Sequence, residues 1–353
     1  YPPMDRGTKA AVLVTGGAGY IGAHTAKALD ERGFFPIVYD SLSSGFREAA
    51  RWGAFVEGDI RDQDALARVM ADHQVSAVIH FAGLIEVGRS MVAPDLFWDI
   101  NVSGTTALLT TMRNHGIGRL VFSSSAAVYG QAGRGPLETI PEDAPKAPAS
   151  PYGDTKLAAE GMIQAQCKAH GLTAVALRYF NAAGADPSGL IGEAHEPETH
   201  LIPLAIAAAL GDGKPLTVFG DDFDTPDGTC LRDYIHVSDL AAAHVAAIDA
   251  KLAPGAFEAI NVGTGQGRSV LEVVGAVGRA AGRPVPYSIG PRRAGDPPSL
   301  VADPGRARAL LGWAPRKPDL DEIVLDALRW ESHPAYGAGA RAIGRRLKST
   351  APA

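Results

Sequence analysis

The stretch AAVLVTGGAGYIG at residues 10–22 limits the possible folds of this chain more than any other segment. A short apolar, β-rich run leads through a glycine turn directly into the helical pattern AHTAKALDERG. Gly16, Gly19 and Gly22 give the turn the spacing G-x-x-G-x-x-G. Such glycines let the backbone approach a pyrophosphate closely, and the amides at the start of the helix supply positive potential. Taken alone, the triplet also fits a tight packing turn between a strand and a helix.

A carboxylate follows the glycine turn at a characteristic distance. Asp40 ends the next apolar run, PIVYD, about 20 residues further on, where an acidic side chain can bind a ribose 2′-hydroxyl. Because the same side chain would repel a 2′-phosphate, it favours NAD over NADP. Asp59, in the sequence GDI, is expected to accept a hydrogen bond from the adenine amine. The alternative for Asp59 is a helix cap for the residues from Arg61 onward.

Apolar runs and helical segments alternate along the first half of the chain. The apolar runs lie at 75–81, 119–123 and 173–178, and the helical segments near 62–72, 94–115 and 152–170. Buried strands that alternate with helices predict a doubly wound parallel sheet. Two later helices are expected, one from Ser269 and one capped by Asp303. The fold class is therefore α/β, a doubly wound parallel (Rossmann) sheet with a smaller C-terminal α/β substrate domain.

The length of 353 residues exceeds what one compact core usually supports, which predicts two domains. Long stretches rich in glycine, proline and acidic residues follow residue 180, and loops of that length tend to be functional. The expected division is a dinucleotide-binding domain at 1–183 with a return segment at about 232–264, a substrate domain at 184–231 and 265–335, and a flexible tail at 336–353.

Composition excludes several classes of partner. The formal charge of −6 makes nucleic acid and anionic membrane surfaces poor candidates. Two cysteines, Cys167 and Cys230, do not make a disulfide framework and fit a reducing compartment. No apolar run approaches the roughly 20 residues of a membrane-spanning helix, and no signal peptide pattern opens the sequence. We therefore expect a cytoplasmic protein.

A metal site is not expected. His195, His200, His236 and the carboxylates of IGEAHEPETH are residues of the ligating type. Their spacing in the sequence does not form a compact ligand motif.

The stretch SPYGDTK at residues 150–156 begins a predicted helix with a tyrosine and a lysine four positions apart. Tyr152 and Lys156 therefore share one face, and a run of three serines, 123–125, closes a strand nearby in the order of the fold. An ammonium, together with the positive ring of bound NAD, would stabilise phenolate and lower a pKa that is about 10 in water. These groups can take a proton from a secondary alcohol while hydride leaves its carbon for NAD.

Six ordered motifs carry a resemblance to a known family: TGGAGYIG, HFAG, SSSAAVYG, SPYGDTK, LRYFN and RDYIHVSDLA. Together they resemble the extended short-chain dehydrogenase/reductases, in particular their nucleotide-sugar 4-epimerases, from about residue 11 to 330. The resemblance implies that Tyr152 removes the proton of the 4′-hydroxyl of a UDP-hexose and that C4 passes hydride to tightly bound NAD. The 4-keto sugar then rotates within the site, and hydride returns to its other face. In this way UDP-glucose and UDP-galactose would be interconverted. It also implies a homodimer formed through the helices near 94–115 and 152–170.

The resemblance assigns residues to each role. The catalytic residues would be Ser125, Tyr152 and Lys156. The NAD contacts would be Gly16, Gly19, Tyr20, Ile21, Gly22, Asp40, Asp59, Ile60, Phe81, Ala82, Gly83, Ser123, Tyr152, Lys156 and Phe180. The UDP-sugar contacts would be Ser125, Tyr152, Asn181, His200, Leu201, Thr217, Val218, Phe219, Arg232, Arg293, Asp296 and Leu300. Ser41, Ile85 and Ile100 stand where many members carry a different, polar residue, and each removes one polar contact near the cofactor.

The chemistry of the residues agrees with part of this assignment. Two guanidinium groups, Arg232 and Arg293, match a diphosphate, and Asp296 can accept from the uridine ribose. A salt bridge with Asp233 or Asp239 is the alternative role for Arg232.

Other activities remain as alternatives. A nucleotide-sugar dehydratase needs an acid pair just after the strand-end serine, and this chain has Ala126 and Ala127 there. UDP-xylose/UDP-arabinose epimerisation shares the mechanism and is hardly separated by sequence. A UDP-N-acetylhexosamine is a third option, because Leu300 is smaller than the tyrosine of some epimerases. A decarboxylase on the same fold is less favoured, and a non-catalytic redox sensor would be expected to lack Tyr152 or Lys156.

Overall fold

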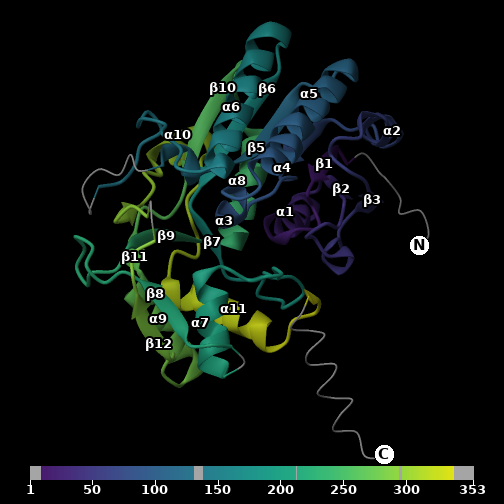
Figure 1. The fold of residues 1–353 in the computed structure, drawn as a ribbon. Helices are drawn as coiled ribbons and strands as arrows, with labels where there is room; N and C mark the ends of the chain where they lie inside the picture. The colour runs from purple at the N-terminus through teal and green to yellow at the C-terminus, as the bar shows by residue number, and fades with distance from the viewer. Residues whose placement is uncertain (1–8, 131–137, 212, 294–295, 338–353) are drawn as a thin grey trace, which may run out of the picture. The chain divides into compact units, whose positions relative to one another are not determined.

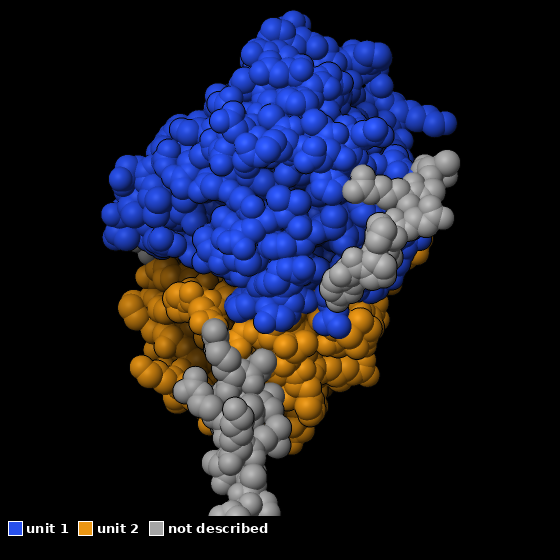
Figure 2. Space-filling view, turned by 90° about the vertical axis from the view of Figure 1, so that its right-hand side faces the viewer, with its two compact units in different colours: residues 1–128, 150–178, 241–260 blue, residues 129–149, 179–240, 261–353 orange. Residues whose placement is uncertain are grey.

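A computed structural model describes residues 9–130, 138–211, 213–293 and 296–337 of the chain. The chain divides into two compact units, which Figure 2 colours separately. Unit 1 comprises residues 1–128, 150–178 and 241–260, and unit 2 comprises residues 129–149, 179–240 and 261–353. Residues 338–353, most of the expected tail, lie outside the described part. Among the helices that the structure describes, none combines the length and the apolar character needed to cross a membrane.

Unit 1 is built on a seven-stranded sheet with the order β10-β6-β5-β4-β1-β2-β3 (Figure 1). Its strands are β1 (Ala11–Thr15), β2 (Phe35–Asp40), β3 (Ala54–Glu57), β4 (Ala77–His80), β5 (Arg119–Ser125), β6 (Thr173–Tyr179) and β10 (Phe257–Val262). The pairs β1–β2, β2–β3, β1–β4 and β4–β5 are parallel. Every residue of β1 and β4 is buried, which is why these strands are almost continuously apolar. The predicted doubly wound parallel sheet is confirmed.

The strand order reverses beside β1, because β2 and β3 extend the sheet on one side and β4 to β10 on the other. Thr15, the last residue of β1, pairs with Tyr39 of β2 and with His80 of β4. Open α/β sheets bind ligands outside the carboxyl ends of their strands at such a reversal. The glycine turn after Thr15 and the loop after His80 both lie at this position.

Helices of unit 1 pack on the sheet around a core that includes Leu13, Ile37, Leu108, Leu120 and Ile163. The helices are α1 (Tyr20–Glu31), α2 (Gln63–Asp72), α3 (Val87–Ser90), α4 (Pro94–Phe97), α5 (Gly104–Asn114) and α6 (Pro151–His170), with α8 (Val237–Asp249) entering from unit 2; short 3-10 turns cover Arg47–Ala49 and Ala126–Tyr129. Helices α5 and α6 lie side by side (Figure 1).

The segment predicted as helical near 94–115 is helical from Pro94 to Asn114, with a π-helical turn in its middle that the sequence did not predict. A π-helical turn at Trp98–Ser103 separates α4 from α5. From the first turn of α5, the Thr105 hydroxyl donates to the carbonyl of Asn101 at 2.5 Å, and Thr106 donates to the carbonyl of Val102 at 2.9 Å, both acceptors lying in the π-helical turn. Such side-chain bonds compete with the helical ladder, and π-helical turns are frequent at functional sites.

Unit 2 contains two small sheets and a layer of helices. In one sheet β9 (Leu231–His236) pairs with β11 (Gly267–Ser269), β13 (Ser299–Leu300) and β7 (Asn181–Ala183); in the other β8 (Leu216–Phe219) pairs in parallel with β12 (Tyr287–Gly290). The helices are α7 (Leu201–Leu210), α9 (Val270–Ala281), α10 (Gly305–Leu311) and α11 (Leu320–Ser332). Helices α7, α9 and α11 pack against one another around Ile206, Val273 and Val324. The expected smaller α/β part is therefore present.

The two late helix starts differ in how well they were predicted. Ser269 caps α9 as expected, since its hydroxyl accepts from the amide of Glu272 at 3.0 Å and the Glu272 carboxylate accepts from the amide of Ser269 at 2.7 Å. Helix α10 begins one residue later than expected, with Pro304 at the cap. Asp303 still contributes, because its Oδ1 accepts from the amide of Gly305 at 2.9 Å.

Candidate active site

The glycine turn leaves space that side chains would fill. Gly16 has a φ of +70°, and a Cβ there would lie 2.6 Å from the amide nitrogen of Ala82. A Cβ on Gly22 would collide with the carbonyl oxygen of Gly16. Tyr20 and Ile21 open α1 directly after Gly19, which caps the helix without a side-chain hydrogen bond, and the first turn carries no acidic residue. The start of α1 therefore fits a bound pyrophosphate in shape and in charge.

Asp40 ties the end of β2 to this turn. Its Oδ2 accepts from the amide of Ala18 at 2.9 Å, and its Oδ1 accepts from the amide of Leu42 at 2.8 Å. Burial raises the pKa of the Asp40 carboxyl, while the two amide hydrogen bonds oppose that rise. Each carboxylate oxygen can accept a second hydrogen bond, so the side chain suits the ribose hydroxyls of a dinucleotide.

Asp59 is held by an arginine and does not cap the following helix. Arg61 donates to its two oxygens, from Nε at 2.9 Å and from Nη2 at 2.6 Å, which lowers the pKa of the Asp59 carboxyl. The cap of α2 is Asp62, whose side chain accepts from the amide of Ala65 at 2.9 Å. Ile60 is buried beside Gly104. Oδ1 of Asp59 also accepts from the amide of Arg61 at 2.8 Å, but the cap of α2 is Asp62 and not Asp59.

The loop after β4 carries Phe81, Ala82 and Gly83 and is fixed at both ends. The amides of Phe81 and Ala82 both donate to the carbonyl of Thr15, at 2.9 and 3.0 Å. Further along, the Asn101 side chain accepts from the amide of Leu84 at 2.8 Å and donates to its carbonyl at 3.1 Å.

Asn101 also links this loop to helix α6. Its Nδ2 lies 3.1 Å from Oγ1 of Thr155, which stands between Tyr152 and Lys156 on α6. The asparagine is 4% exposed and lies in the π-helical turn. Sequence reasoning missed Asn101, because nothing in its local pattern marks a contact with residues 54 positions away. A polar residue in a segment of helical periodicity was the one available signal.

Ser125, Tyr152 and Lys156 come together as the spacing predicts. Ser150 caps α6 by accepting from the amide of Gly153 at 3.2 Å, and Pro151 occupies the first turn. This start places Tyr152 at the carboxyl end of β5, where Ser125 is hydrogen-bonded to the phenol. The Nζ of Lys156 donates to the carbonyl of Ser123 at 2.8 Å and lies 5.9 Å from the centre of the tyrosine ring.

The pKa values of this group differ from the expectation. Burial raises the pKa of the Tyr152 phenol, and the hydrogen bond with Ser125 only opposes that rise. Burial lowers the pKa of Lys156 to about 8, with the carboxylate of Glu160 acting in the opposite direction. The expected lowering of the Tyr152 pKa by Lys156 is therefore not found in the chain alone, because the phenol is buried and the ammonium is hydrogen-bonded to the strand end.

A buried ion pair is hydrogen-bonded to the end of β5. Arg178 of β6 donates to both carboxylate oxygens of Glu160 in α6, at 2.9 and 2.6 Å, and Ser124 donates to the first of these oxygens at 2.5 Å. The side chains of Arg178 and Glu160 are only 4% and 5% exposed. Ser124 lies between Ser123 and Ser125, so the pair fixes the strand end that carries both. Sequence reasoning missed Glu160 and Arg178.

Within unit 2, several predicted substrate residues converge. Asp296 accepts from Nε of Arg293 at 2.9 Å and lies 3.6 Å from Nη2 of Arg232. The Arg293 guanidinium stacks on the ring of Phe219 at 5.0 Å, and Leu300 pairs with Arg232 across β13 and β9. Two cations, one carboxylate and an exposed aromatic ring suit a nucleoside diphosphate.

The other predicted substrate residues of unit 2 are placed as follows. Asn181 is the first residue of β7, and Phe180 directly precedes it. In β8, Thr217 is exposed, whereas Val218 is buried in the core. The alternative ion pairs of Arg232 are not seen: Asp233 accepts from the amide and hydroxyl of Thr264, and Asp239 from the amides of residues 316 and 317.

His200 and Leu201 stand at the start of α7, and the imidazole of His200 belongs to a separate cluster. Its Nδ1 lies 2.6 Å from Oε1 of Glu193 and 3.3 Å from Oε1 of Glu198. The third candidate histidine, His236, is elsewhere, with Nε2 3.2 Å from Oδ2 of Asp326. Both cysteines are free and buried, and burial raises the pKa of Cys167 to about 11.

Comparison with known proteins agrees with this class of site. The sequence model of the NAD dependent epimerase/dehydratase family matches residues 12–263. The chain belongs to this family, and the predicted resemblance and NAD dependence are confirmed. It is 49% identical over 326 residues to UDP-glucose 4-epimerase of Rhizobium meliloti (strain 1021), covering 92% of this chain and 98% of that protein.

Two solved structures extend the comparison. The UDP-glucose 4-epimerase from Brucella ovis in complex with NAD is 50% identical with a TM-score of 0.86, covering 90% of this chain and 97% of that one. The UDP-glucose 4-epimerase from Bifidobacterium longum in complex with NAD⁺ and UDP is 40% identical with a TM-score of 0.85, covering 92% and 98%.

Proposed function

We propose that this chain is a UDP-hexose 4-epimerase that interconverts UDP-glucose and UDP-galactose with tightly bound NAD. The observation that carries the proposal is the buried phenol of Tyr152, hydrogen-bonded to Ser125 at the carboxyl end of β5. Ala126 and Ala127 follow that serine, and neither side chain has an acid or base for the elimination step of a dehydratase.

The proposed roles follow from the chemistry of each side chain. Tyr152 takes the proton of the sugar 4′-hydroxyl and later returns it, and Ser125 donates a hydrogen bond to the reacting oxygens. Lys156 supplies positive charge beside the phenol. Bound NAD would supply the hydride acceptor at C4 and the hydride donor for the opposite face of the 4-keto sugar.

Binding is proposed to concentrate on the two nucleotides. Gly16, the start of α1 and Asp40 would hold NAD, in line with the space and the hydrogen-bond acceptors described above. Arg232, Arg293 and their shared carboxylate would hold UDP. If the UDP group stays anchored, the hexose can rotate between the two hydride transfers and present its other face without leaving the protein.

The range of sugars is open at Leu300, beside Arg232, because a side chain of this size leaves room at the 2-position of the sugar. Proton NMR of UDP-glucose, UDP-N-acetylglucosamine and UDP-xylose, each incubated with the protein, tests the proposal directly. We expect a new galacto-anomeric signal with UDP-glucose. Signals with the N-acetyl or pentose sugar would extend the range, and loss of water or CO₂ would indicate a dehydratase or a decarboxylase. No new sugar signal in any tube would refute the proposal.

Removal of the Tyr152 hydroxyl tests the assigned base. Tyr152→Phe should lower kcat by roughly 10²- to 10⁴-fold, the usual contribution of acid–base catalysis. The variant should still copurify with NAD, because the hydroxyl is not needed for the pyrophosphate cradle. Tyr287→Phe is the matched control, since Tyr287 is 45% exposed on β12. Wild-type activity in Tyr152→Phe would show that the base is another residue.

A homodimer and a cytoplasmic location complete the proposal. The dimer is proposed to form through the segments near 94–115 and 152–170, in which α5 and α6 pack side by side. Size-exclusion chromatography with light scattering should give twice the mass of one chain. A monomer at micromolar concentration would contradict it. The two free cysteines suit a reducing compartment.

A further inference from the structure

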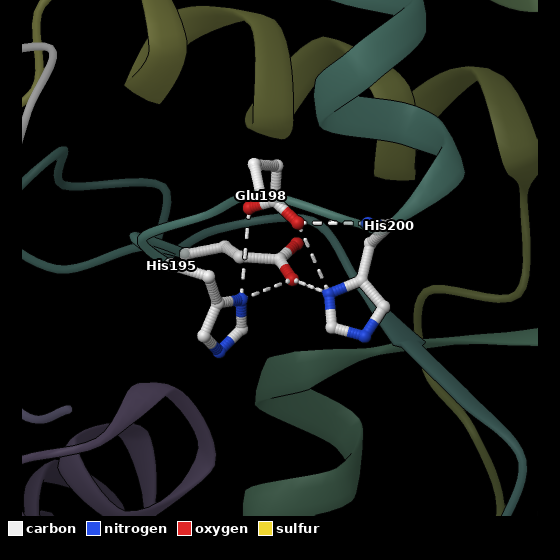
Figure 3. A group of neighbouring side chains, drawn as sticks. His195, Glu198 and His200 are labelled. Carbon is white, nitrogen blue, oxygen red and sulfur yellow. Dashed lines mark hydrogen bonds and ion pairs between the residues drawn. The ribbon is translucent and has the colours of Figure 1, made fainter. Parts of the chain in front are cut away.

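We propose that Glu193, His195, Glu198 and His200 form a structural zinc site in the segment that precedes helix α7. The four residues come from one stretch, E-A-H-E-P-E-T-H, in which the unit E-x-H occurs twice. Each offers one ligating atom, and these atoms all lie within 4.8 Å of one another (Figure 3). The proposal does not depend on the epimerase activity.

The distances between the ligating atoms fit a tetrahedral site. In such a site, zinc bonds of about 2.1 Å place neighbouring ligand atoms about 3.4 Å apart. Nδ1 of His195 lies 3.1 Å from Oε1 of Glu193 and 3.6 Å from Oε2 of Glu198. Nδ1 of His200 lies 2.6 Å from the same Oε1 of Glu193 and 3.3 Å from the other oxygen of Glu198, Oε1. The 2.6 Å distance is shorter than the distance between two ligands of one zinc ion, so these two atoms would move apart when a cation enters, and one oxygen of Glu198 would serve as the ligand.

The ligand types and the charge also suit zinc. Imidazole nitrogen and carboxylate oxygen both bind this ion, and four protein ligands close a structural site. Two carboxylates with two neutral imidazoles carry a net charge of −2, which one divalent cation neutralises. The carboxylate of Glu193 is 6% exposed and needs a compensating charge, which the two imidazoles supply when protonated and a divalent cation would supply when bound.

The two nitrogens enter the cluster in the same way. Figure 3 shows both imidazole rings turned so that Nδ1 faces the carboxylates. Burial alone would lower the imidazole pKa values, but hydrogen bonds that the imidazoles donate to the two carboxylates raise the pKa of His195 to about 9 and that of His200 to about 10.

The position of the cluster gives the site a role. Residues 184–200 contain neither a helix nor a strand, and such a segment is held by few backbone–backbone hydrogen bonds. Glu198 already fixes the last residues of this segment, because its Oε1 accepts from the amides of Thr199 and His200 at 2.7 and 2.8 Å. A metal ion would cross-link both halves of the stretch and fix the start of α7, as structural zinc does in small loops.

Zinc content is the decisive measurement. Protein without an affinity tag is purified from zinc-supplemented cultures, dialysed against metal-free buffer and analysed by inductively coupled plasma mass spectrometry. We expect about one zinc per chain. Zinc returned to the chelator-treated protein should raise its melting temperature, and magnesium or calcium should not, because oxygen-preferring cations do not favour imidazole. Replacement by cobalt should give the intense visible absorption of a tetrahedral centre.

Two variants with matched controls assign the ion to this site. Glu198→Gln keeps an oxygen for the two amides but loses the anionic ligand, and His195→Gln removes one imidazole. Each should weaken zinc binding by roughly 100-fold or more, beyond the effect of a supporting residue. The controls are Glu196→Gln, in the same segment but outside the four, and His333→Gln, which is exposed.

Two results would overturn the proposal. If the wild type holds less than about a tenth of a zinc per chain and its melting temperature does not change with zinc, the four residues form an ion-pair cluster only. If both variants retain wild-type zinc, the ion lies elsewhere. Circular dichroism and the melting temperature without metal confirm that each variant is folded. Should Glu198→Gln fail to fold, His195→Gln decides the question.

Discussion

The buried pair of Glu160 and Arg178 offers a quantitative test of how the end of strand β5 is held. Arg178 binds both carboxylate oxygens, and Ser124 binds one of them. Removal of one charge from a pair this buried leaves the other uncompensated, which typically destabilises a protein by about 3 to 5 kcal/mol. Replacement of both charges by apolar residues of similar volume is often neutral or even stabilising.

Arg178→Met should therefore be much less stable than the double variant Glu160→Met/Arg178→Met. The single variant leaves the Glu160 carboxylate with Ser124 as its described partner, so we expect the loss of about 3 to 5 kcal/mol. The double variant leaves the Ser124 hydroxyl without its carboxylate partner, which costs about 1 to 3 kcal/mol before any gain from apolar packing. Two single losses of at least about 3 kcal/mol each, against a double loss of at most about 3 kcal/mol, predict a coupling energy of about 3 kcal/mol or more.

Urea unfolding followed by circular dichroism, on the wild type, both single variants and the double variant, completes the cycle. A single variant that does not fold already displays the large loss, and the double variant remains the decisive measurement. If the losses of the two single variants simply add in the double variant, to within about 0.5 kcal/mol, then the pair is not coupled and the reasoning fails.

Three further changes test other parts of unit 1. Gly16→Ala should destabilise the protein by about 2 to 4 kcal/mol and release NAD, because strain at positive φ adds to a clash with the backbone. Its control is Gly33→Ala, at a φ of +90° with open space, which should lower the free energy of unfolding by about 1 kcal/mol through strain alone. Equal unfolding free energies of the two variants would contradict this. The folded pKa of Lys156 is lowered to about 8 from 10.5, so the unfolded chain binds more protons between these values and stability rises with pH there. Wild-type stability should therefore increase relative to Lys156→Met from pH 8 to 10 in urea unfolding, and a constant difference would refute the shift. Asn101→Ala should lower stability by about 1 to 3 kcal/mol and speed NAD release, because it removes the hydrogen-bond partner of the partly buried amide and carbonyl of Leu84. Asn114→Ala, on the exposed end of α5, should change neither quantity, and equal NAD release from both variants would contradict the role of Asn101.

Local patterns predicted the parts of the site that depend on local geometry. The glycine turn follows from residue spacing alone, since a left-handed residue and a close approach of α1 both demand glycine at positions 16 and 22. Tyr152 and Lys156 share a face because a helix places positions i and i+4 together. The doubly wound sheet follows from the alternation of buried strands and helices.

Long-range contacts were beyond the reach of such patterns. Asn101 matters through Leu84 and Thr155, which are distant in sequence, and the π-helical turn that carries it has no separate periodicity. The cluster around Glu193 was recognised as a set of possible ligands, but no metal site was predicted. The ligating atoms of the cluster are brought together by an irregular segment. Such a segment has no hydrophobic periodicity from which the contact could be predicted.

The state of Tyr152 links cofactor binding to the proposed proton transfer. In the chain itself, burial outweighs the hydrogen bond with Ser125, so the phenol is a weaker acid than tyrosine in water. Lys156 cannot reverse this from its place on the carbonyl of Ser123, where its own pKa is lowered by the same burial. A further positive charge is needed before the phenol can act as a base near neutral pH, and the oxidised nicotinamide ring carries one. Proton abstraction would then become effective only when the hydride acceptor is present, which protects the site from removing protons that cannot lead to turnover.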